Sequence, residues 1–156
     1  MKTININVSS KNYNIYVGKG ILSQSGDIIK NLGFDGKILI VTDDNVAPLY
    51  LDIVKNSIEK CGIKVFNLIL PNGEEHKNME SILKIYQEAV KSNINRKDMF
   101  VALGGGVVGD MTGFAAATFL RGLKYVQIPT TLLAQVDSSI GGKTGTTSAA
   151  GSCLIL

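Results

Sequence analysis

The segment GGGVVGD, from Gly104 to Asp110, carries the clearest chemical signal in this sequence. Gly104, Gly106 and Gly109 satisfy the G-x-G-x-x-G spacing between a predicted strand and a predicted helix, where a pyrophosphate can approach backbone N–H groups. No Asp or Glu follows at a distance of about twenty residues, so this is not the standard dinucleotide fingerprint. Glycines required only for a tight turn and close helix packing are the alternative.

A second stretch, DSSIGGKTG from Asp137 to Gly145, looks like the lysine end of a triphosphate-binding loop. That loop needs a glycine where this chain has Asp137, and it needs a preceding strand where TLLAQV predicts a helix. The triphosphate interpretation therefore fails. Asp137 and Lys143 can still face one polar ligand, the lysine by charge and the aspartate by accepting hydroxyl hydrogen bonds; a solvated loop is the alternative.

Other polar residues also follow predicted strands, at Asp43, from Asn72 to Lys77, and at Thr130 and Thr131. Taken singly, each has a structural explanation as a solvated helix approach or a helix cap, and Arg121 as a cation at a helix C-terminus. Because the carboxyl ends of parallel strands meet at one edge of a sheet, we expect the groups that follow strands to converge.

The elements that must position these groups alternate along the chain. TININV and NYNIYV predict an opening strand pair, and KILIVTDDN, KVFNLIL, MFVAL and YVQI predict buried strands. Helices are predicted from about Ile21 to Leu32, from about Val46 to Lys60, after an N-cap at Asn78, and after the glycines to about Leu120. We therefore predict an α/β fold, a Rossmann-like parallel sheet flanked by helices, with a short N-terminal strand pair.

Composition restricts the class of protein. A chain of 156 residues with 45% hydrophobic content can bury the core of one domain. The net charge of +3 comes from scattered basic residues, and Asp110 interrupts the most apolar stretch, so we expect no nucleic-acid partner, no membrane and a cytoplasmic location. His76 is the single histidine, which excludes a zinc site built from several histidines of these residues.

Two long motifs, GGGVVGDMTGFAAATFLRG and IPTTLLAQVDSSIGGKTG, resemble 3-dehydroquinate synthase, the NAD-dependent second enzyme of the shikimate pathway. TDDN and NGEEHK resemble it more weakly, and the match keeps its order and spacing to about Gly145. The resemblance implies an N-terminal α/β domain that binds NAD. It also implies a mostly helical C-terminal domain that supplies the metal ligands, for zinc or cobalt, and much of the substrate site.

The same resemblance implies the residues that bind NAD. Asp43 and Asn45 would contact the adenosine end, with Glu74 and Lys77 beside them. The remaining contacts to the pyrophosphate, the ribose and the rest of the pocket would be Gly73, Gly105, Gly106, Val107, Val108, Gly109, Asp110, Thr130 and Thr131.

Arg121, Asp137 and Lys143 are implied as catalytic-site contacts to the substrate, an anionic sugar-acid phosphate. The family converts 3-deoxy-D-arabino-heptulosonate 7-phosphate to 3-dehydroquinate and phosphate, a carbon–oxygen lyase reaction in which NAD is regenerated at each turnover. The resemblance also implies a homodimer for the full-length protein.

After Gly145 the sequence TTSAAGSCLIL departs from the family. We expect an NAD-binding domain over residues 1–145, a non-family tail over 146–156, and no C-terminal metal-binding domain. Such a truncated chain should bind NAD weakly or not at all, lack synthase activity, and associate through an exposed apolar face.

Three alternatives stay open at this point. One is a related sugar-phosphate cyclase, such as an inosose or valiolone synthase. Another is a polyol dehydrogenase of the glycerol type, and the last is a non-enzymatic NAD-binding fragment that pairs with another chain.

Overall fold

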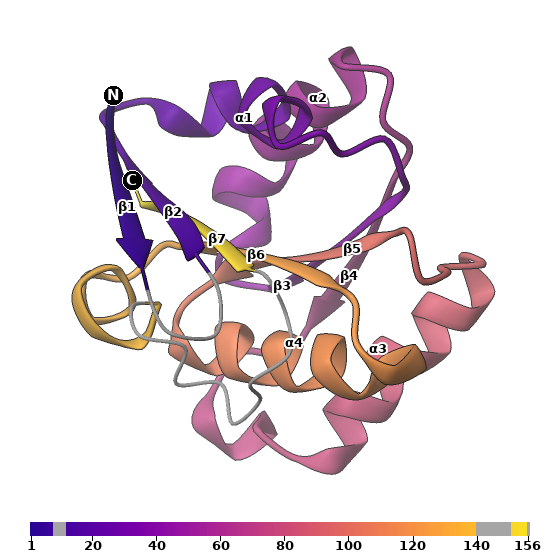
Figure 1. Cartoon of the computed structure of the whole chain (residues 1–156). Helices are drawn as coiled ribbons and strands as arrows, with labels where there is room; N and C mark the ends of the chain where they lie inside the picture. Colours follow the sequence, from indigo (N-terminus) through magenta and orange to yellow (C-terminus); the bar gives the residue numbers. More distant parts are fainter. Residues whose placement is uncertain (8–11, 140–150, 156) are drawn as a thin grey trace.

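A computed structural model describes residues 1–7, 12–139 and 151–155 (Figure 1). Its described strands form one sheet in the order β1-β2-β7-β6-β5-β3-β4. β1 and β2 pair antiparallel, and every other neighbouring pair is parallel. The strands are β1 (Lys2–Asn7), β2 (Asn12–Val17), β3 (Ile38–Asp43), β4 (Val65–Leu70), β5 (Met99–Gly104), β6 (Lys124–Pro129) and β7 (Gly151–Ile155).

Helices cover both faces of the sheet, with α1 and α2 on one face and α3 and α4 on the other (Figure 1). No helix of the described ranges combines the length and the apolar character needed to cross a membrane. The α-helices are α1 (Ser25–Asn31), α2 (Asp52–Lys60), α3 (Met79–Lys91) and α4 (Gly106–Thr118). Short 3-10 or π turns are η1 (Ile21–Gln24), η2 (Ala47–Leu51), η3 (Glu74–His76), η4 (Phe119–Arg121) and η5 (Ala134–Ser138).

Two hydrophobic cores lie on the two faces of the sheet, and β3 contributes to both. Ile38 and Ile40 pack in the core that contains the buried side chains of α1 and α2. Leu39 and Val41 pack in the core that contains those of α3 and α4. A strand buried on both faces must be apolar at every position, which explains the unbroken run in the sequence. The α/β fold with a parallel sheet flanked by helices is therefore confirmed.

Most predicted helix ends agree with the structure. Gly33 adopts a φ of 73° after α1, and the Asn78 side chain accepts a hydrogen bond from the Ser81 N–H at 3.0 Å. The helix expected to reach about Leu120 instead ends at Thr118. Leu120 and Arg121 then take φ values of 50° and 69°, a left-handed pair that turns the chain toward β6.

The C-terminal segment, which the sequence suggested was a tail, contributes a strand to the sheet. β7 lies within the range 146–156 and occupies the place between β2 and β6. Cys153 is in register with Ile15 on one side and with Gln127 on the other. β7 therefore links the opening strand pair to the parallel strands, while the domain boundary at Gly145 stays a prediction.

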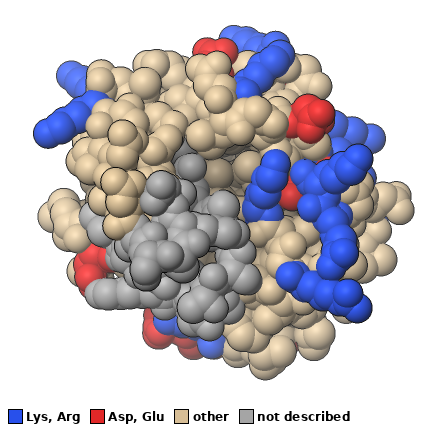
Figure 2. All heavy atoms as spheres, viewed as in Figure 1, with Lys and Arg blue, Asp and Glu red and all other residues tan. Residues whose placement is uncertain are grey.

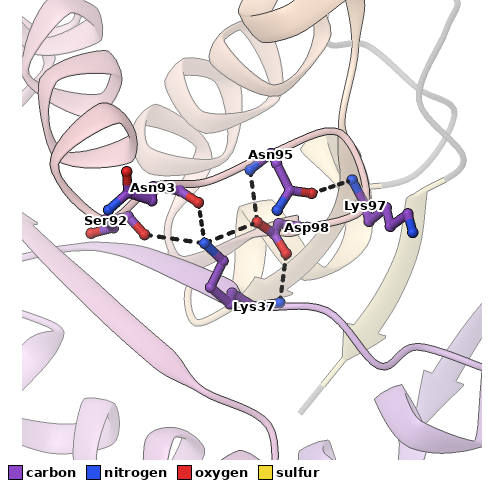
Figure 3. Close-up of polar contacts among 6 residues, drawn as sticks. All are labelled: Lys37, Ser92, Asn93, Asn95, Lys97 and Asp98. Atoms are coloured by element: carbon purple, nitrogen blue, oxygen red, sulfur yellow. Dashed lines mark hydrogen bonds and ion pairs between the residues drawn. The ribbon is translucent and has the colours of Figure 1, made fainter.

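A buried carboxylate joins the start of β3 to the turn before β5 (Figure 3). The Asp98 side chain is 2% exposed; one oxygen accepts the Lys37 N–H at 2.7 Å and the other accepts the Asn95 N–H at 2.7 Å. The Lys37 ammonium lies 3.6 Å from the carboxylate and also donates to the carbonyls of Ser92 and Asn93. Two backbone donors and one cation thus compensate a buried charge.

We expect Asp98→Ala to lower the free energy of unfolding by about 3 kcal/mol, because it leaves buried N–H groups and the Lys37 ammonium without their acceptor. Urea denaturation followed by circular dichroism measures the change. Asp35→Ala is the matched control, since Asp35 is exposed in the loop before β3, two residues from Lys37. Equal stability of the two variants would show that the Asp98 carboxylate does not hold this junction.

Candidate functional site

The loops that follow β3, β4, β5 and β6 meet at one edge of the sheet. The Thr130 N–H donates to the Gly104 carbonyl at 2.9 Å, which joins the ends of β6 and β5. The Asp44 N–H donates to the Leu70 carbonyl at 3.1 Å, which joins the ends of β3 and β4. β3 and β5 are adjacent in the sheet, so the polar segments after all four strands are brought together as the alternation predicted.

α4 starts at the centre of this edge, directly after β5. Gly105 occupies the N-cap position, and no side chain caps the helix there. A Cβ at Gly105 would lie 3.1 Å from Thr131 Cγ2, and one at Gly106 would lie 3.4 Å from Ser138 Oγ. The first N–H groups of a helix lack intrahelical acceptors and carry partial positive charge. Because Gly105 and Gly106 have no side chains, an anion could approach these backbone donors closely.

Gly109 has a different role in the motif. A Cβ there would lie 2.3 Å from Gln127 Nε2, whose side chain is buried against the helix. The Tyr125 hydroxyl also donates to the Gly109 carbonyl at 2.9 Å. This glycine allows α4 to lie close to β6, which is the packing alternative weighed for the motif. Its assignment as a cofactor contact stays a prediction.

A pair of opposite charges links the loop after β4 to α4. Lys77 Nζ lies 2.8 Å from Asp110 Oδ2 and 3.6 Å from Glu74 Oε1. The hydrogen bond to Asp110, followed by the charges of Asp110 and Glu74, raises the pKa of Lys77 above its ordinary 10.5, although desolvation opposes the rise. Considered singly, these residues suggested a solvated helix approach; the structure joins Lys77 to Asp110 instead.

Asp43 and Asp44 shape the neighbouring loop. Asp43 Oδ1 accepts the N–H groups of Asn45 at 3.0 Å and Val46 at 2.9 Å, so this carboxylate orders the start of the helical segment after β3. Asp44 Oδ1 accepts both the backbone and the side-chain N–H of Asn72, and this hydrogen bonding lowers the pKa of Asp44. The sequence analysis assigned no role to the Asp44–Asn72 contact, which only the adjacency of β3 and β4 creates.

Several buried hydroxyls have no hydrogen-bond partner within the described part of the chain. They are Thr42, Thr112, Thr130, Ser138 and Ser139. A buried hydroxyl without a partner costs free energy, so such groups in a native structure suggest a missing water or ligand. Thr130 and the two serines follow β6, and Ser138 lies beside the open start of α4.

Arg121 is not part of this edge. α4 starts at the carboxyl edge and its 13 residues carry the chain away from it, roughly 20 Å at 1.5 Å per residue. The Arg96 side chain, which precedes β5, donates to the Leu120 carbonyl at 3.1 Å, so Arg121 lies near the amino ends of the strands. Figure 2 shows Lys and Arg side chains gathered on the right of the molecule, where β5 begins in Figure 1.

The remaining predicted residues divide into two groups. Asp137 is exposed in η5, the segment that brings Ser138 to Gly106. Lys143 lies outside the described residues.

Within the described ranges, no three His, Cys, Asp or Glu side chains are grouped so that they could hold a metal ion. The described side chains therefore do not fit a divalent metal.

Solved structures with this architecture define its class. A 2-deoxy-scyllo-inosose synthase, solved with carbaglucose-6-phosphate, NAD+ and Co2+, matches with a TM-score of 0.88 and 23% identity, over 99% of this chain and 44% of that one. A 2-epi-5-epi-valiolone synthase from Streptomyces hygroscopicus, solved with NAD+ and Zn2+, matches with a TM-score of 0.79 and 24% identity, over 96% of this chain and 44% of that one. The chain therefore has the fold that makes up about 44% of each of these synthases.

Sequence relatives are more specific. The family profile described as 3-dehydroquinate synthase N-terminal matches residues 67–155, a range that includes β7. A 3-dehydroquinate synthase from Neisseria meningitidis serogroup C is 48% identical over 92% of this chain and 40% of its own length. One from Solanum lycopersicum, described as chloroplastic, is 46% identical over 91% of this chain and 32% of its own length.

The chain belongs to the 3-dehydroquinate synthase family. It spans about 40% of the length of the bacterial relative and about a third of the plant one.

We expect Asp110→Asn to lower the pKa of Lys77, because the variant removes the negative charge and weakens the hydrogen bond that raise it. A pKa raised on folding means that the pair stabilises the fold fully below pH 10.5, and that this contribution disappears as the pH rises through the folded pKa. Titration of the Lys77 side-chain NMR signals measures the shift. Glu75→Gln is the control, and an unchanged Lys77 pKa in Asp110→Asn would contradict the pairing.

Proposed function

We propose that this chain is the dinucleotide-binding part of a 3-dehydroquinate synthase and that, within the complete protein, the carboxyl edge of its sheet holds NAD. The observation that supports this most is the open start of α4, where two consecutive glycines and unpartnered hydroxyls surround free backbone donors. A dinucleotide pyrophosphate matches this arrangement in charge and in hydrogen-bonding capacity.

The rest of the edge has the polarity to orient the two ends of a dinucleotide. We assign the adenosine end to Asp43 and Asn45, with Gly73 and Glu74 beside them. Asp43 Oδ1 is occupied by two backbone donors, which fixes the carboxylate in one orientation. A fixed acceptor can then receive ribose hydroxyl hydrogen bonds without further ordering.

The central part of the dinucleotide would lie along α4. The Lys77–Asp110 ion pair is half-exposed, so it offers both a cation and a carboxylate oxygen to the phosphates and to the ribose. The N–H groups of the first turn, from Gly105 through Val107 and Val108, would donate to the pyrophosphate. Thr130 and Thr131 would close the pocket from the end of β6, where the Thr130 hydroxyl has no partner among the described residues.

Bound NAD would supply reversible hydride acceptance, which acidifies a carbon beside the oxidised position and permits elimination of phosphate. The residues of this chain would bind and orient the reactants. Asp137 and Lys143 would face the anionic sugar-acid phosphate, the aspartate as hydroxyl acceptor and the lysine as counter-charge. Arg121 lies near the opposite edge of this chain, and its role as a substrate contact remains a proposal drawn from the family resemblance.

The metal would be held elsewhere. We propose that zinc or cobalt binds to the part of the relatives that this chain does not span, since the described residues offer no cluster for it. The complete protein would then be a homodimer that acts in the cytoplasm, with no nucleic-acid or membrane partner. The boundary of the NAD-binding unit would fall near Gly145.

Related cyclases are the strongest alternative, because the inosose and valiolone synthases have the same fold. The chain is 23% and 24% identical in sequence to these two cyclases but 48% identical to the Neisseria 3-dehydroquinate synthase. The higher identity favours 3-dehydroquinate synthase as the function. A glycerol dehydrogenase from Schizosaccharomyces pombe matches less closely, with a TM-score of 0.57 over 74% of this chain and 27% of that one.

We expect this chain alone, supplied with NAD and zinc, to form no measurable 3-dehydroquinate from 3-deoxy-D-arabino-heptulosonate 7-phosphate. The same chain joined at Gly145 to the C-terminal part of the Neisseria relative should form it, because the joined protein regains metal ligands. Phosphate release and 3-dehydroquinate absorbance measure the reaction. Activity of the chain alone, or a joined protein that binds NAD by calorimetry but remains inactive, would contradict the proposed division of roles.

In the joined protein, Lys143→Ala should weaken substrate binding at least tenfold and leave the NAD affinity within about twofold, because a charged hydrogen bond to the substrate is lost. Separate calorimetric titrations with NAD and with a non-reacting substrate analogue measure the two affinities. Lys19→Ala, an exposed lysine before η1, is the control. Equal losses for both ligands would contradict the assignment of Lys143 to the substrate.

A further inference from the structure

Ser138 ends η5, the helical segment that follows β6, and the fold places it against a different element. Its Oγ lies 3.4 Å from the position that a Cβ at Gly106 would take, and its own Cβ lies 3.8 Å from that position. Gly106 is the first residue of α4. The serine hydroxyl therefore stands beside the first turn of a helix whose N-terminus has no side-chain cap.

This hydroxyl is buried and has no hydrogen-bond partner among the described residues. The next residue, Ser139, is 9% exposed, and its hydroxyl also lacks a partner. Of these two hydroxyls, that of Ser138 lies beside the uncapped start of α4, and a buried hydroxyl without a partner among the described residues indicates that an acceptor belongs there. Gly106 has no side chain, so it cannot supply an acceptor for the Ser138 hydroxyl.

We infer that Ser138 is a binding residue for the dinucleotide, donating its hydroxyl hydrogen to a pyrophosphate oxygen held at the start of α4. The inference rests on the proposed function, since it assigns a further contact to the same site. The backbone N–H groups of α4 approach the anion from one side, and the Ser138 hydroxyl approaches from the β6 side. Together they enclose it with donors from two consecutive βα connections.

The proposed hydrogen bond between Ser138 and the pyrophosphate has a consequence for the stability of the chain without ligand. Without a ligand, the Ser138 hydroxyl has no partner among the described residues that would compensate its desolvation, so its removal should not destabilise the fold. A serine retained for packing would behave in the opposite way. Ser138→Ala should therefore unfold at the same denaturant concentration as the unchanged chain, or at a higher one, while binding the dinucleotide less tightly.

The test uses ADP-ribose, which carries the pyrophosphate, and adenosine, which does not. Each is titrated into the full 156-residue chain and into the joined protein, with backbone NMR shifts reporting even weak binding. We expect Ser138→Ala to weaken ADP-ribose roughly tenfold and adenosine by less than about twofold, as for one hydrogen bond to a charged acceptor. Ser138→Thr, which keeps a hydroxyl, should retain more of the affinity. Ser23→Ala, an exposed serine remote from α4, should change neither ligand.

Each other outcome overturns the inference in a distinguishable way. Unchanged ADP-ribose affinity in Ser138→Ala shows that a water, not the phosphate, satisfies the hydroxyl. Equal losses for ADP-ribose and adenosine, together with reduced stability in urea, show a packing role. Absence of ADP-ribose binding by both unsubstituted proteins overturns the proposed dinucleotide function as well.

Discussion

The site depends on how closely α4 lies against the end of β6. That distance is set by Gly109, where any side chain would overlap the buried Gln127 amide, and by the Tyr125 hydroxyl that holds the Gly109 carbonyl. Gly109 fixes the position of α4. The first turn of this helix therefore lies at the carboxyl edge, where its N–H groups have no intrahelical acceptors. The position of the proposed anion site thus depends on a packing constraint one turn away.

The other loops complete the edge through contacts that cross strand boundaries. Asn72 binds Asp44 between the ends of β4 and β3, and Lys77 binds Asp110 between the loop after β4 and the helix after β5. At the opposite edge, Asp98 and Lys37 hold the starts of β3 and β5 together. β3 and β5, which run between these two sets of polar contacts, are buried on both faces, so they form a rigid centre of the sheet.

The chain belongs to the 3-dehydroquinate synthase family and spans about 40% of the length of a bacterial relative. Its described residues show what this part of the family fold contributes. The described residues provide a mostly parallel sheet with a polar edge, yet no metal cluster occurs among them. Large apolar side chains also remain exposed on the segment after β6: Leu132, Leu133 and Val136 are 75%, 70% and 63% exposed. An exposed apolar surface therefore follows β6 at the edge that is proposed to hold the dinucleotide.

The sequence by itself determined the order of strands and helices, because doubly buried strands require unbroken apolar runs and helices require a periodic face. It also indicated that Asp43, the glycines and Thr130 would share one edge, since each directly follows a strand. Only the tertiary structure decided that Gly109 serves packing, that Arg121 lies near the other edge, and that Ser138 stands over Gly106. These relations depend on the distances between elements far apart in the chain, which no local pattern encodes. The same reason explains why β7, in the segment that the sequence suggested was a tail, completes the sheet between β2 and β6.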